Sequence, residues 1–269
     1  MLGAILGDIF GSGHRGSPSD DFDFELSHPE CGFTDETVLT IAIANAIANN
    51  ESYQSNIRKF AKEHPNVPGG YGSNFRFWLY TGGDEPYRSL GIGPAARVSS
   101  VGWAFDDLTT TLAEAEKTAR ATHDHVEAIK GAVALAHGIY LGKKGFDAES
   151  MKKIITENYG YDLEKSLYAL QESPILEAIT PTLMPIVFVS VFEAKSTERA
   201  LVNAVKFGGP AGALASMTGA LAESLYGIPE HLKQDVLRRL PETFLNVMAH
   251  FREIQSNQLS IEDRGSHAA

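Results

Sequence analysis

Apolar residues recur at helical spacing through most of the chain, so helices are the expected elements. Within residues 124–142, for example, Ile129, Val133 and Ala136 fall on one face. Further helices are predicted at about 52–63, 109–122, 147–158, 163–170, 185–193 and 197–206. Only the short apolar run at 186–191 fits a helix and a strand equally well. Because the pattern shows no repeat, linker or domain boundary, the sequence predicts an all-α fold, a single compact multi-helix domain.

Residues 207–229, FGGPAGALASMTGALAESLYGIP, predict a central helix entered through a glycine-rich turn. The first half consists almost wholly of small residues, which allow neighbouring backbone to approach closely. Pro210 suits the first turn of a helix, and Gly227 followed by Pro229 suits its end. Such a segment is either a plain core helix or the floor of a ligand site.

The first residues, MLGAILGDIFGSG, predict a helix with glycines spaced four apart. Gly3, Gly7 and Gly11 share one helical face, against which a partner helix could pack closely. Asp8 is embedded in this apolar stretch, and a buried carboxylate needs hydrogen-bond partners or a cation. A capping role for Asp8 is at least as well supported as a catalytic one. The loop at 14–32 then carries an acidic patch, Asp20, Asp21, Asp23 and Glu25.

The clearest helix start is at 34–49, TDETVLTIAIANAIAN. Thr34 is a good N-cap, and Asp35 and Glu36 in the first turn complement the helix dipole. Most starts of this kind are only caps. A hydroxyl and two adjacent carboxylates are nevertheless hard oxygen ligands of the kind that magnesium prefers.

Two glycine-rich segments follow, at 67–83 and 86–102. The first is expected to include a short helix. The second is interpreted as a turn whose backbone N–H groups could cradle a phosphate, although a Gly-x-Gly motif usually marks only a turn. His123 and His125 stand at the start of a later helix. Being two residues apart, they point to different sides of a helix and could share a metal only ahead of it, so capping is the favoured interpretation.

Composition narrows the possible partners. The formal net charge is -11, which opposes unassisted binding to nucleic acid or to an anionic membrane. The one cysteine, Cys31, excludes an intramolecular disulfide and a cysteine-based metal cluster, and it fits a reducing cytosol. No secretory leader and no membrane-spanning apolar run is recognised. The sequence is therefore expected to be that of a cytoplasmic protein.

The end of the chain changes character. A last helical stretch is predicted from about Glu230 to about Ile254, with Pro241 kinking or splitting it. The residues beyond are polar. The domain is therefore assigned to residues 1–255, and residues 256–269 are expected to form a polar, disordered tail.

Five stretches in order resemble the ADP-ribosylglycohydrolase family: LGAILGDIFGS, FTDETVLTIAIANA, RVSSVGWAFDDL, ATHDHVEAIKGA, and FGG followed by TGALAESLYGIP. The resemblance extends to about residue 232. It implies an all-helical fold and hydrolysis of the bond that joins ADP-ribose to an acceptor. It also implies two magnesium ions, held by a Thr-Asp-Asp helix start and by an Asp-x-Asp-Thr motif after a Gly-Gly turn. Magnesium and carboxylates suit this reaction because its transition state resembles an oxocarbenium ion.

This chain departs from the family pattern at the metal motifs. The first survives with Glu36 in place of the second aspartate. The second is lost, because residues 208–213 read GGPAGA where the family has GGDSDT. The family's Ser-Tyr-Gly-Asn-Gly loop here reads SLGIG at 89–93, which removes a ring and an amide, whereas His123 matches a family position near the ligand. The acidic residue expected near residue 14 or 15 is missing.

The resemblance assigns site residues as follows. Asp35 and Glu36 are candidate catalytic residues, and Thr34, Asp35 and Glu36 are candidate ligands of one magnesium ion, which is possible but not required. The candidate ligand-binding residues are Ser89, Gly91, Gly93, His123, Gly208 and Gly209.

Three functions stay open at this stage. The first is an altered hydrolase of ADP-ribosyl bonds, acting on ADP-ribose attached to a protein or other acceptor with at most one metal. The second is a catalytically inactive homologue that serves as a nucleotide- or protein-binding module. The weakest is a structural helical protein without a small ligand. Loss of the standard two-magnesium mechanism is expected in each case, because the carboxylates that would offset cation dehydration are gone.

Overall fold

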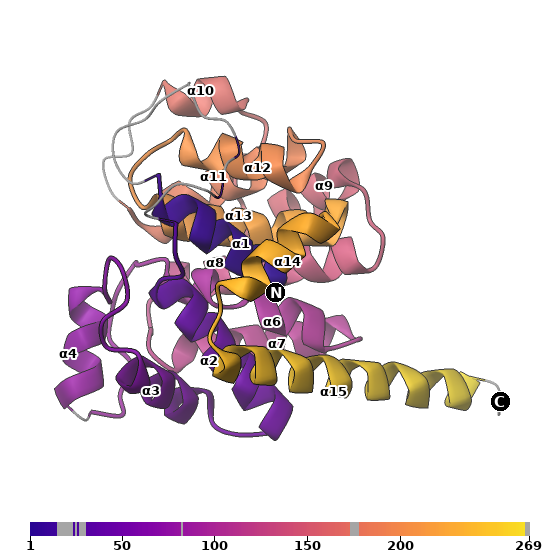
Figure 1. The fold of residues 1–269 in the computed structure, drawn as a ribbon. Helices are drawn as coiled ribbons and strands as arrows, with labels where there is room; N and C mark the ends of the chain where they lie inside the picture. Colours follow the sequence, from indigo (N-terminus) through magenta and orange to yellow (C-terminus); the bar gives the residue numbers. More distant parts are fainter. Residues whose placement is uncertain (15–23, 25, 27–30, 82, 173–177, 267–269) are drawn as a thin grey trace.

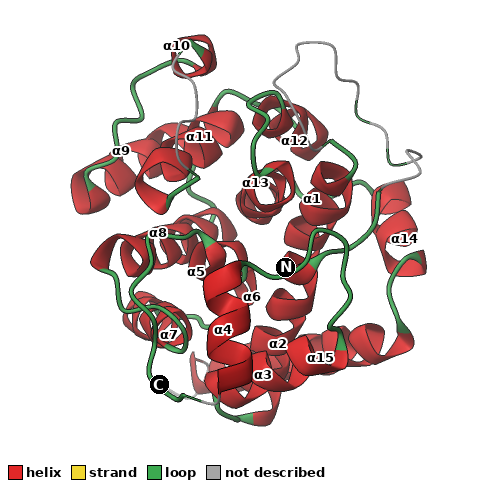
Figure 2. Cartoon of the chain, turned by 90° about the vertical axis from the view of Figure 1, so that its left-hand side faces the viewer, coloured by secondary structure: helices red, strands yellow, loops and turns green. Residues whose placement is uncertain are grey.

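The computed structural model describes residues 1–14, 24, 26, 31–81, 83–172 and 178–266, with 257–266 as backbone only, and helices joined by loops make up this part of the protein (Figure 2). These residues form fifteen helices and no strand, apart from one isolated bridge between Tyr87 and His123. The all-α prediction is confirmed. The helices are α1 (Leu2–Ser12), α2 (Asp35–Asn49), α3 (Tyr53–Glu63), α4 (Ser73–Thr81), α5 (Gly93–Ala96), α6 (Ser99–Ala104), α7 (Leu108–Arg120), α8 (Val126–Lys143), α9 (Ala148–Tyr159), α10 (Leu167–Gln171), α11 (Thr180–Phe192), α12 (Thr197–Val205), α13 (Ala211–Tyr226), α14 (Glu230–Arg238) and α15 (Glu242–Ser266).

Helices α1 and α13 lie side by side at the centre of the molecule (Figure 1). The predicted glycine face of α1 is the contact surface. A Cβ atom at Gly7 would lie only 1.9 Å from the carbonyl oxygen of Ala215, and one at Gly3 only 2.2 Å from that of Gly219. Glycine is therefore required at these positions because the two backbones touch.

The pair is shared between two apolar clusters. Ala4 on α1 and Leu221 on α13 belong to one cluster with helices α8 and α11, whereas Ile5 and Ala215 belong to the other with α2, α14 and α15. Every residue of α1 is buried. The centre of the fold is thus set by the small-residue segments at 1–13 and 207–229 that the sequence singled out.

The ends of α13 follow the predicted turn chemistry. Gly208 and Gly209 adopt φ of 66° and 62°, a region that favours glycine, and Pro210 takes the N-cap position. Gly227, with φ of 68°, ends the helix. These two glycine turns fix where the helix begins and stops.

The structure resolves one local ambiguity, corrects one expectation and leaves a third untested. The ambiguous run at 186–191 is helical and lies within α11, which begins at Thr180 because Pro181 suits a first helical turn. The segment at 86–102 is more than a turn, since it contains α5 and most of α6. The acidic patch Asp20, Asp21, Asp23 and Glu25 lies outside the described residues.

The C-terminal region is split at Pro241, as predicted, into α14 and α15. The predicted end near Ile254 was too early, because α15 continues to Ser266. Residues 255–264 contain no proline or glycine that would stop a helix. The separation of residues 256–269 from the domain stays a prediction.

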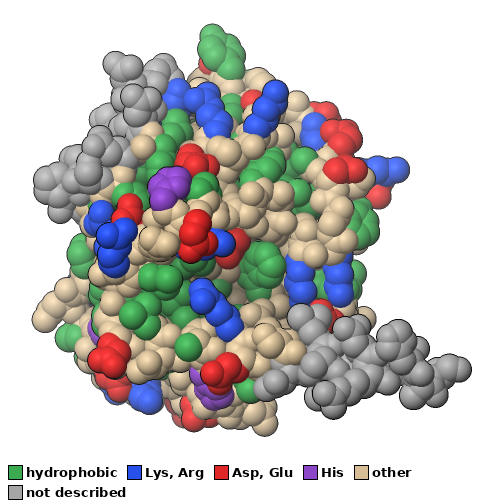
Figure 3. Space-filling model, turned by 45° about the vertical axis from the view of Figure 1, so that its right-hand side comes forward, with side chains coloured by type: hydrophobic (Ala, Val, Ile, Leu, Met, Phe, Trp, Pro, Cys, Tyr) green, Lys and Arg blue, Asp and Glu red, His purple; other side chains and the backbone are tan. Residues whose placement is uncertain are grey.

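The surface carries both signs of charge. On the face in Figure 3, acidic and basic side chains are interspersed among apolar and uncharged groups. Among the described residues, no helix is long and apolar enough to cross a membrane.

Candidate functional site

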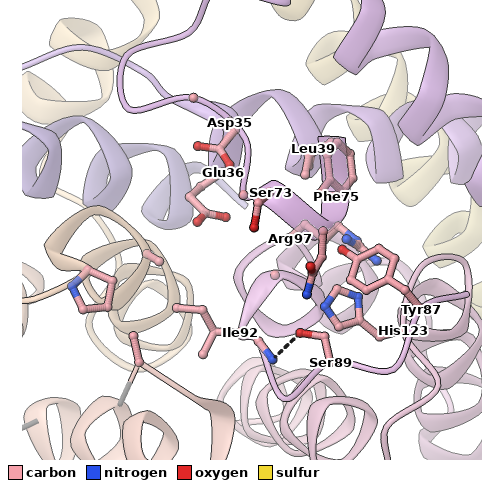
Figure 4. Close-up of a pocket in the computed structure, with 18 residues that line it drawn as sticks. Asp35, Glu36, Leu39, Ser73, Phe75, Tyr87, Ser89, Ile92, Arg97 and His123 are labelled. Atoms are coloured by element: carbon pink, nitrogen blue, oxygen red, sulfur yellow. Dashed lines mark hydrogen bonds between the residues drawn. The ribbon is translucent and has the colours of Figure 1, made fainter. Parts of the chain in front are cut away.

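Two adjoining cavities of about 390 Å³ and 270 Å³ form one cleft. Figure 4 shows the larger of the two. The residues common to both are Asp35, Glu36, Gly70, Pro210 and Ala213. The larger cavity continues past Phe75 toward Ser89, Arg97 and His123. The smaller one ends at Thr34 and residues 209–213. The cleft is large enough for part or all of a nucleotide-sized ligand.

The carboxylate side of the cleft is the start of α2. Thr34 caps this helix by accepting a hydrogen bond from the Glu36 N–H at 3.3 Å. Asp35 and Glu36 then line both cavities, so the structure brings the two candidate catalytic residues into the cleft. The cap positions them there.

Asp8 on α1 accepts hydrogen bonds from residues at the start of α2. Its carboxylate accepts bonds from the N–H and hydroxyl of Thr34, at 2.7 and 2.6 Å, and from those of Thr37, at 3.2 and 2.6 Å. The side chain is fully buried, and burial raises its pKa above the usual value. Asp8 does not line either cavity. The capping interpretation therefore applies, and Asp8 is a positioning residue rather than a candidate metal ligand.

The opposite side of the smaller cavity is the start of α13. It presents Pro210, Ala211, Gly212 and Ala213, none of which carries a side-chain oxygen. Gly209 lines the cleft, whereas Gly208 lines neither cavity. The contact predicted between Gly208 and a ligand is thus not supported by its position.

These residues do not fit a two-magnesium centre. Among the described residues, no group of three or more histidine, cysteine, aspartate or glutamate side chains could hold a metal ion. Magnesium demands near-octahedral oxygen coordination, and here only the α2 side offers carboxylates. The Thr34 hydroxyl already donates to Asp8 at 2.6 Å. A single ion at Asp35 and Glu36 stays a prediction.

The far end of the larger cavity is built by loop 87–93 and the Thr122–His123 segment. The Tyr87 N–H donates to the Thr122 carbonyl at 2.8 Å, and the Tyr87 and His123 rings lie 4.5 Å apart. The Ser89 hydroxyl accepts from the Gly91 N–H at 3.0 Å. The predicted ligand-binding residues Ser89, Gly91, Gly93 and His123 therefore gather at one end of the cleft.

Arg97 is the site residue that the sequence interpretation missed. Its side chain is fully buried and lines the larger cavity. One terminal nitrogen, Nη2, donates to the Thr118 carbonyl at 3.0 Å and to the Thr122 hydroxyl at 2.7 Å, while Nε has no partner. Burial lowers the pKa of Arg97 to about 10, so it stays charged at neutral pH. The sequence feature that could have identified Arg97 is its position as the one charged residue in the segment GIGPAARVSSVG.

His123 differs from a usual surface histidine. It is buried, and burial together with the neighbouring Arg97 charge lowers its pKa to about 3. The ring is therefore neutral at physiological pH. His125 has a separate role, because its Nδ1 caps α8 by accepting from the Glu127 N–H at 3.1 Å. The two histidines do not share a metal site.

The fold and cleft define a class: an all-helical protein with a nucleotide-sized cleft, one acidic side and one cationic end. Comparison with known proteins gives the family. A model of the ADP-ribosylglycohydrolase family matches residues 1–263, and the chain belongs to this family.

Two further proteins are similar to this chain, one over about half of its length and the other over nearly all of it. An uncharacterised protein of Archaeoglobus fulgidus is 31% identical over 154 residues, which is 51% of this chain and 50% of that protein. The chain thus matches about half the length of this relative. A solved structure described as an ADP-ribosylglycohydrolase-related protein complex shares the fold, with a TM-score of 0.71, 20% identity, and coverage of 94% of this chain and 97% of that one.

Proposed function

We propose that the cleft binds ADP-ribose, or the ADP-ribosyl group of a modified molecule, without the two-magnesium hydrolytic centre. The observation that carries this proposal is the asymmetry of the cleft. The end near Ser89, Arg97 and His123 presents side-chain hydrogen-bond donors, whereas the lining residues of the α13 side carry no side-chain oxygen. The protein is therefore a nucleotide-binding homologue of the glycohydrolases.

A cleft-filling variant tests the location of binding. Ala213 lines both cavities, and Ala213→Phe would fill the space between α13 and α2. ADP-ribose titrated calorimetrically into the folded protein is expected to bind the wild type and to lose at least about tenfold in affinity in the variant. Ala148→Phe, on α9 away from both cavities, is the control. Equal affinity in all three folded proteins would contradict the proposal.

Asp35 and Glu36 support a second candidate, residual hydrolysis of the glycosidic bond with at most one metal. Both carboxylates line the cleft, where one of them could accept a proton from attacking water or stabilise positive charge on the ribose. Release of ADP-ribose from ADP-ribosylated arginine and serine peptides is the assay. Hydrolysis that disappears in Asp35→Asn or Glu36→Gln would establish this second function. Hydrolysis unaffected by both substitutions would exclude these carboxylates as its catalytic residues.

A further inference from the structure

Helix α4 carries aromatic side chains on two opposite faces. Phe75, Trp78 and Leu79 are buried and belong to one of the two apolar clusters. Phe77 and Tyr80 are 72% and 63% exposed. Because successive residues of a helix are turned by about 100°, the buried and exposed sets lie on opposite sides of α4. The solvent face of such a helix is ordinarily polar, so two neighbouring aromatic rings on it indicate a surface that another molecule covers.

The exposed rings do not hold α4 in place. Arg58 of α3 stacks over the Trp78 ring, with its guanidinium carbon 3.9 Å from the ring centroid. Its Nη1 donates to the backbone carbonyls of Trp78 and Leu79, both at 3.3 Å. These contacts fix the helix without the exposed rings. Truncation of those rings should therefore leave the fold intact, and in the wild type the rings are presented on a rigid support.

The exposed face of α4 leads out of the cleft. Ser73, in the first turn, lines the larger cavity together with Asp35 and Glu36. Figure 4 shows Ser73 on the side of the cavity where these two carboxylates lie. Phe77 and Tyr80 follow Ser73 by four and seven residues, so they continue the same stripe about 6 Å and 10 Å further along the helix axis. A group attached to the ligand at the carboxylate side can extend over this stripe.

The composition of the face favours a polypeptide as its occupant. Arg76 is exposed on the same side of α4, and aromatic residues and arginine are enriched where proteins bind one another. A nucleic acid would need a basic surface, whereas the chain has a net charge of -11 and α4 carries one arginine.

The size of the face indicates how it would act. Two aromatic side chains bury roughly 150–250 Å² each, well below the roughly 800 Å² per partner of a stable protein interface. The face is therefore suited to strengthen the binding of a molecule that the cleft already holds, and not to bind a protein alone.

We propose that the exposed α4 face, formed by Arg76, Phe77 and Tyr80, docks the polypeptide part of an ADP-ribosylated protein through apolar side chains near the modified residue. The inference rests on the proposed function, because the ADP-ribosyl group in the cleft supplies the attachment. An extended chain advances about 3.3 Å per residue, so the rings at about 6 Å and 10 Å match side chains two and three residues from the modified one.

Three ligands, titrated calorimetrically in chelator, test the docking site. They are free ADP-ribose, a peptide ADP-ribosylated on serine with leucine two and three residues to either side, and the same peptide with glycine at those positions. The wild type is expected to bind the leucine peptide at least about tenfold more tightly than the glycine peptide. Phe77→Ala combined with Tyr80→Ala should reduce this preference to within about twofold. The double variant should bind free ADP-ribose like the wild type, because neither ring lines a cavity.

Tyr168→Ala is the matched control. It removes a ring that is 71% exposed on α10 and lines neither cavity, so the preference for the leucine peptide should remain.

The outcomes separate this inference from the proposed function. Equal affinity of the wild type for the two peptides, or a leucine preference that survives in the folded double variant, would overturn the docking site while ADP-ribose binding leaves the proposed function standing. No binding of ADP-ribose or of either peptide to the wild type would overturn the proposed function and the inference with it. A wild-type dimer in sedimentation velocity that the double variant loses would assign the face to a second copy of the chain, and would also overturn the inference.

Discussion

At the scale of single residues, the buried ionisable groups fall into two sets, each hydrogen-bonded to threonine side chains. Asp8 is surrounded by four donors from Thr34 and Thr37 and serves the start of α2. Arg97 and His123 are joined through Thr122 and face the cleft. In both places a threonine hydroxyl forms a hydrogen bond with a buried ionisable side chain. Without such a bond, burial of that side chain would destabilise the fold.

Removal of the Asp8 carboxylate should therefore destabilise the fold strongly. Asp8→Ala leaves the buried donors of Thr34 and Thr37 without an acceptor, and a loss of about 3 kcal/mol or more in the free energy of unfolding is expected. Urea denaturation followed by circular dichroism measures it. Asp235→Ala is the control, because its exposed pair with Arg238 should contribute less than about 1 kcal/mol. Equal losses in the two variants would contradict the capping role.

The lowered pKa of His123 predicts a contribution to acid sensitivity. The unfolded chain takes up this proton below its ordinary pKa of 6.5, whereas the folded protein does so only near pH 3. Stability is therefore lost as the pH falls through this window, by about 1.4 kcal/mol per pH unit from this residue.

His123→Asn removes that titration. The difference in unfolding free energy between the wild type and His123→Asn, measured by urea denaturation between pH 7 and pH 4, should change in favour of the variant as the pH falls. A difference that is constant with pH would contradict the buried, neutral state of the histidine.

At the scale of elements, the shape of the cleft depends on how closely α1 and α13 approach. Their contact brings the start of α13 opposite that of α2 and so sets the width of the smaller cavity. The glycines of α1 are the reason that the contact is possible.

Gly7→Ala should break this contact. The new methyl group would lie 1.9 Å from the Ala215 carbonyl oxygen, which belongs to backbone and has no room to move aside. We expect a loss of at least about 3 kcal/mol, or failure to fold. Gly32→Ala is the matched control, since no atom lies within 4 Å of its added Cβ. Comparable urea midpoints for the two variants would show that α1 and α13 are not packed in this way.

Carboxylates can be restored to the α13 side of the cleft to test whether it then binds magnesium. Pro210→Asp combined with Gly212→Asp would return two carboxylates opposite Asp35 and Glu36. A Cβ atom at Gly212 lies 3.6 Å from Asp8 Oδ1, so the added charge should lower the melting temperature in chelator. Magnesium should then raise it, because an ion that binds only the folded state stabilises it.

The double asparagine variant, Pro210→Asn with Gly212→Asn, controls for side-chain size and should not respond to magnesium. If the double aspartate variant is equally insensitive, the cleft has changed in shape as well as in its ligands.

At the scale of the whole molecule, sequence reasoning recovers what depends on local pattern. The helical class, the glycine face of α1, the cap at Thr34 and the central helix all follow from residue spacing and turn chemistry. The partners of Asp8 do not, since Thr34 and Thr37 are 26 and 29 residues away. The importance of Arg97 likewise depends on a contact across 25 residues, which no periodicity reveals.

The central claim is that the cleft binds the nucleotide without magnesium. Calorimetric titration of ADP-ribose into one protein sample, first in chelator and then in magnesium, tests it most directly. We expect binding in chelator with an affinity that magnesium changes by less than about threefold, because the proposed contacts from side-chain donors of the cleft need no metal bridge. Binding that appears only when magnesium is added would contradict the account and would restore a metal site to the centre of the mechanism.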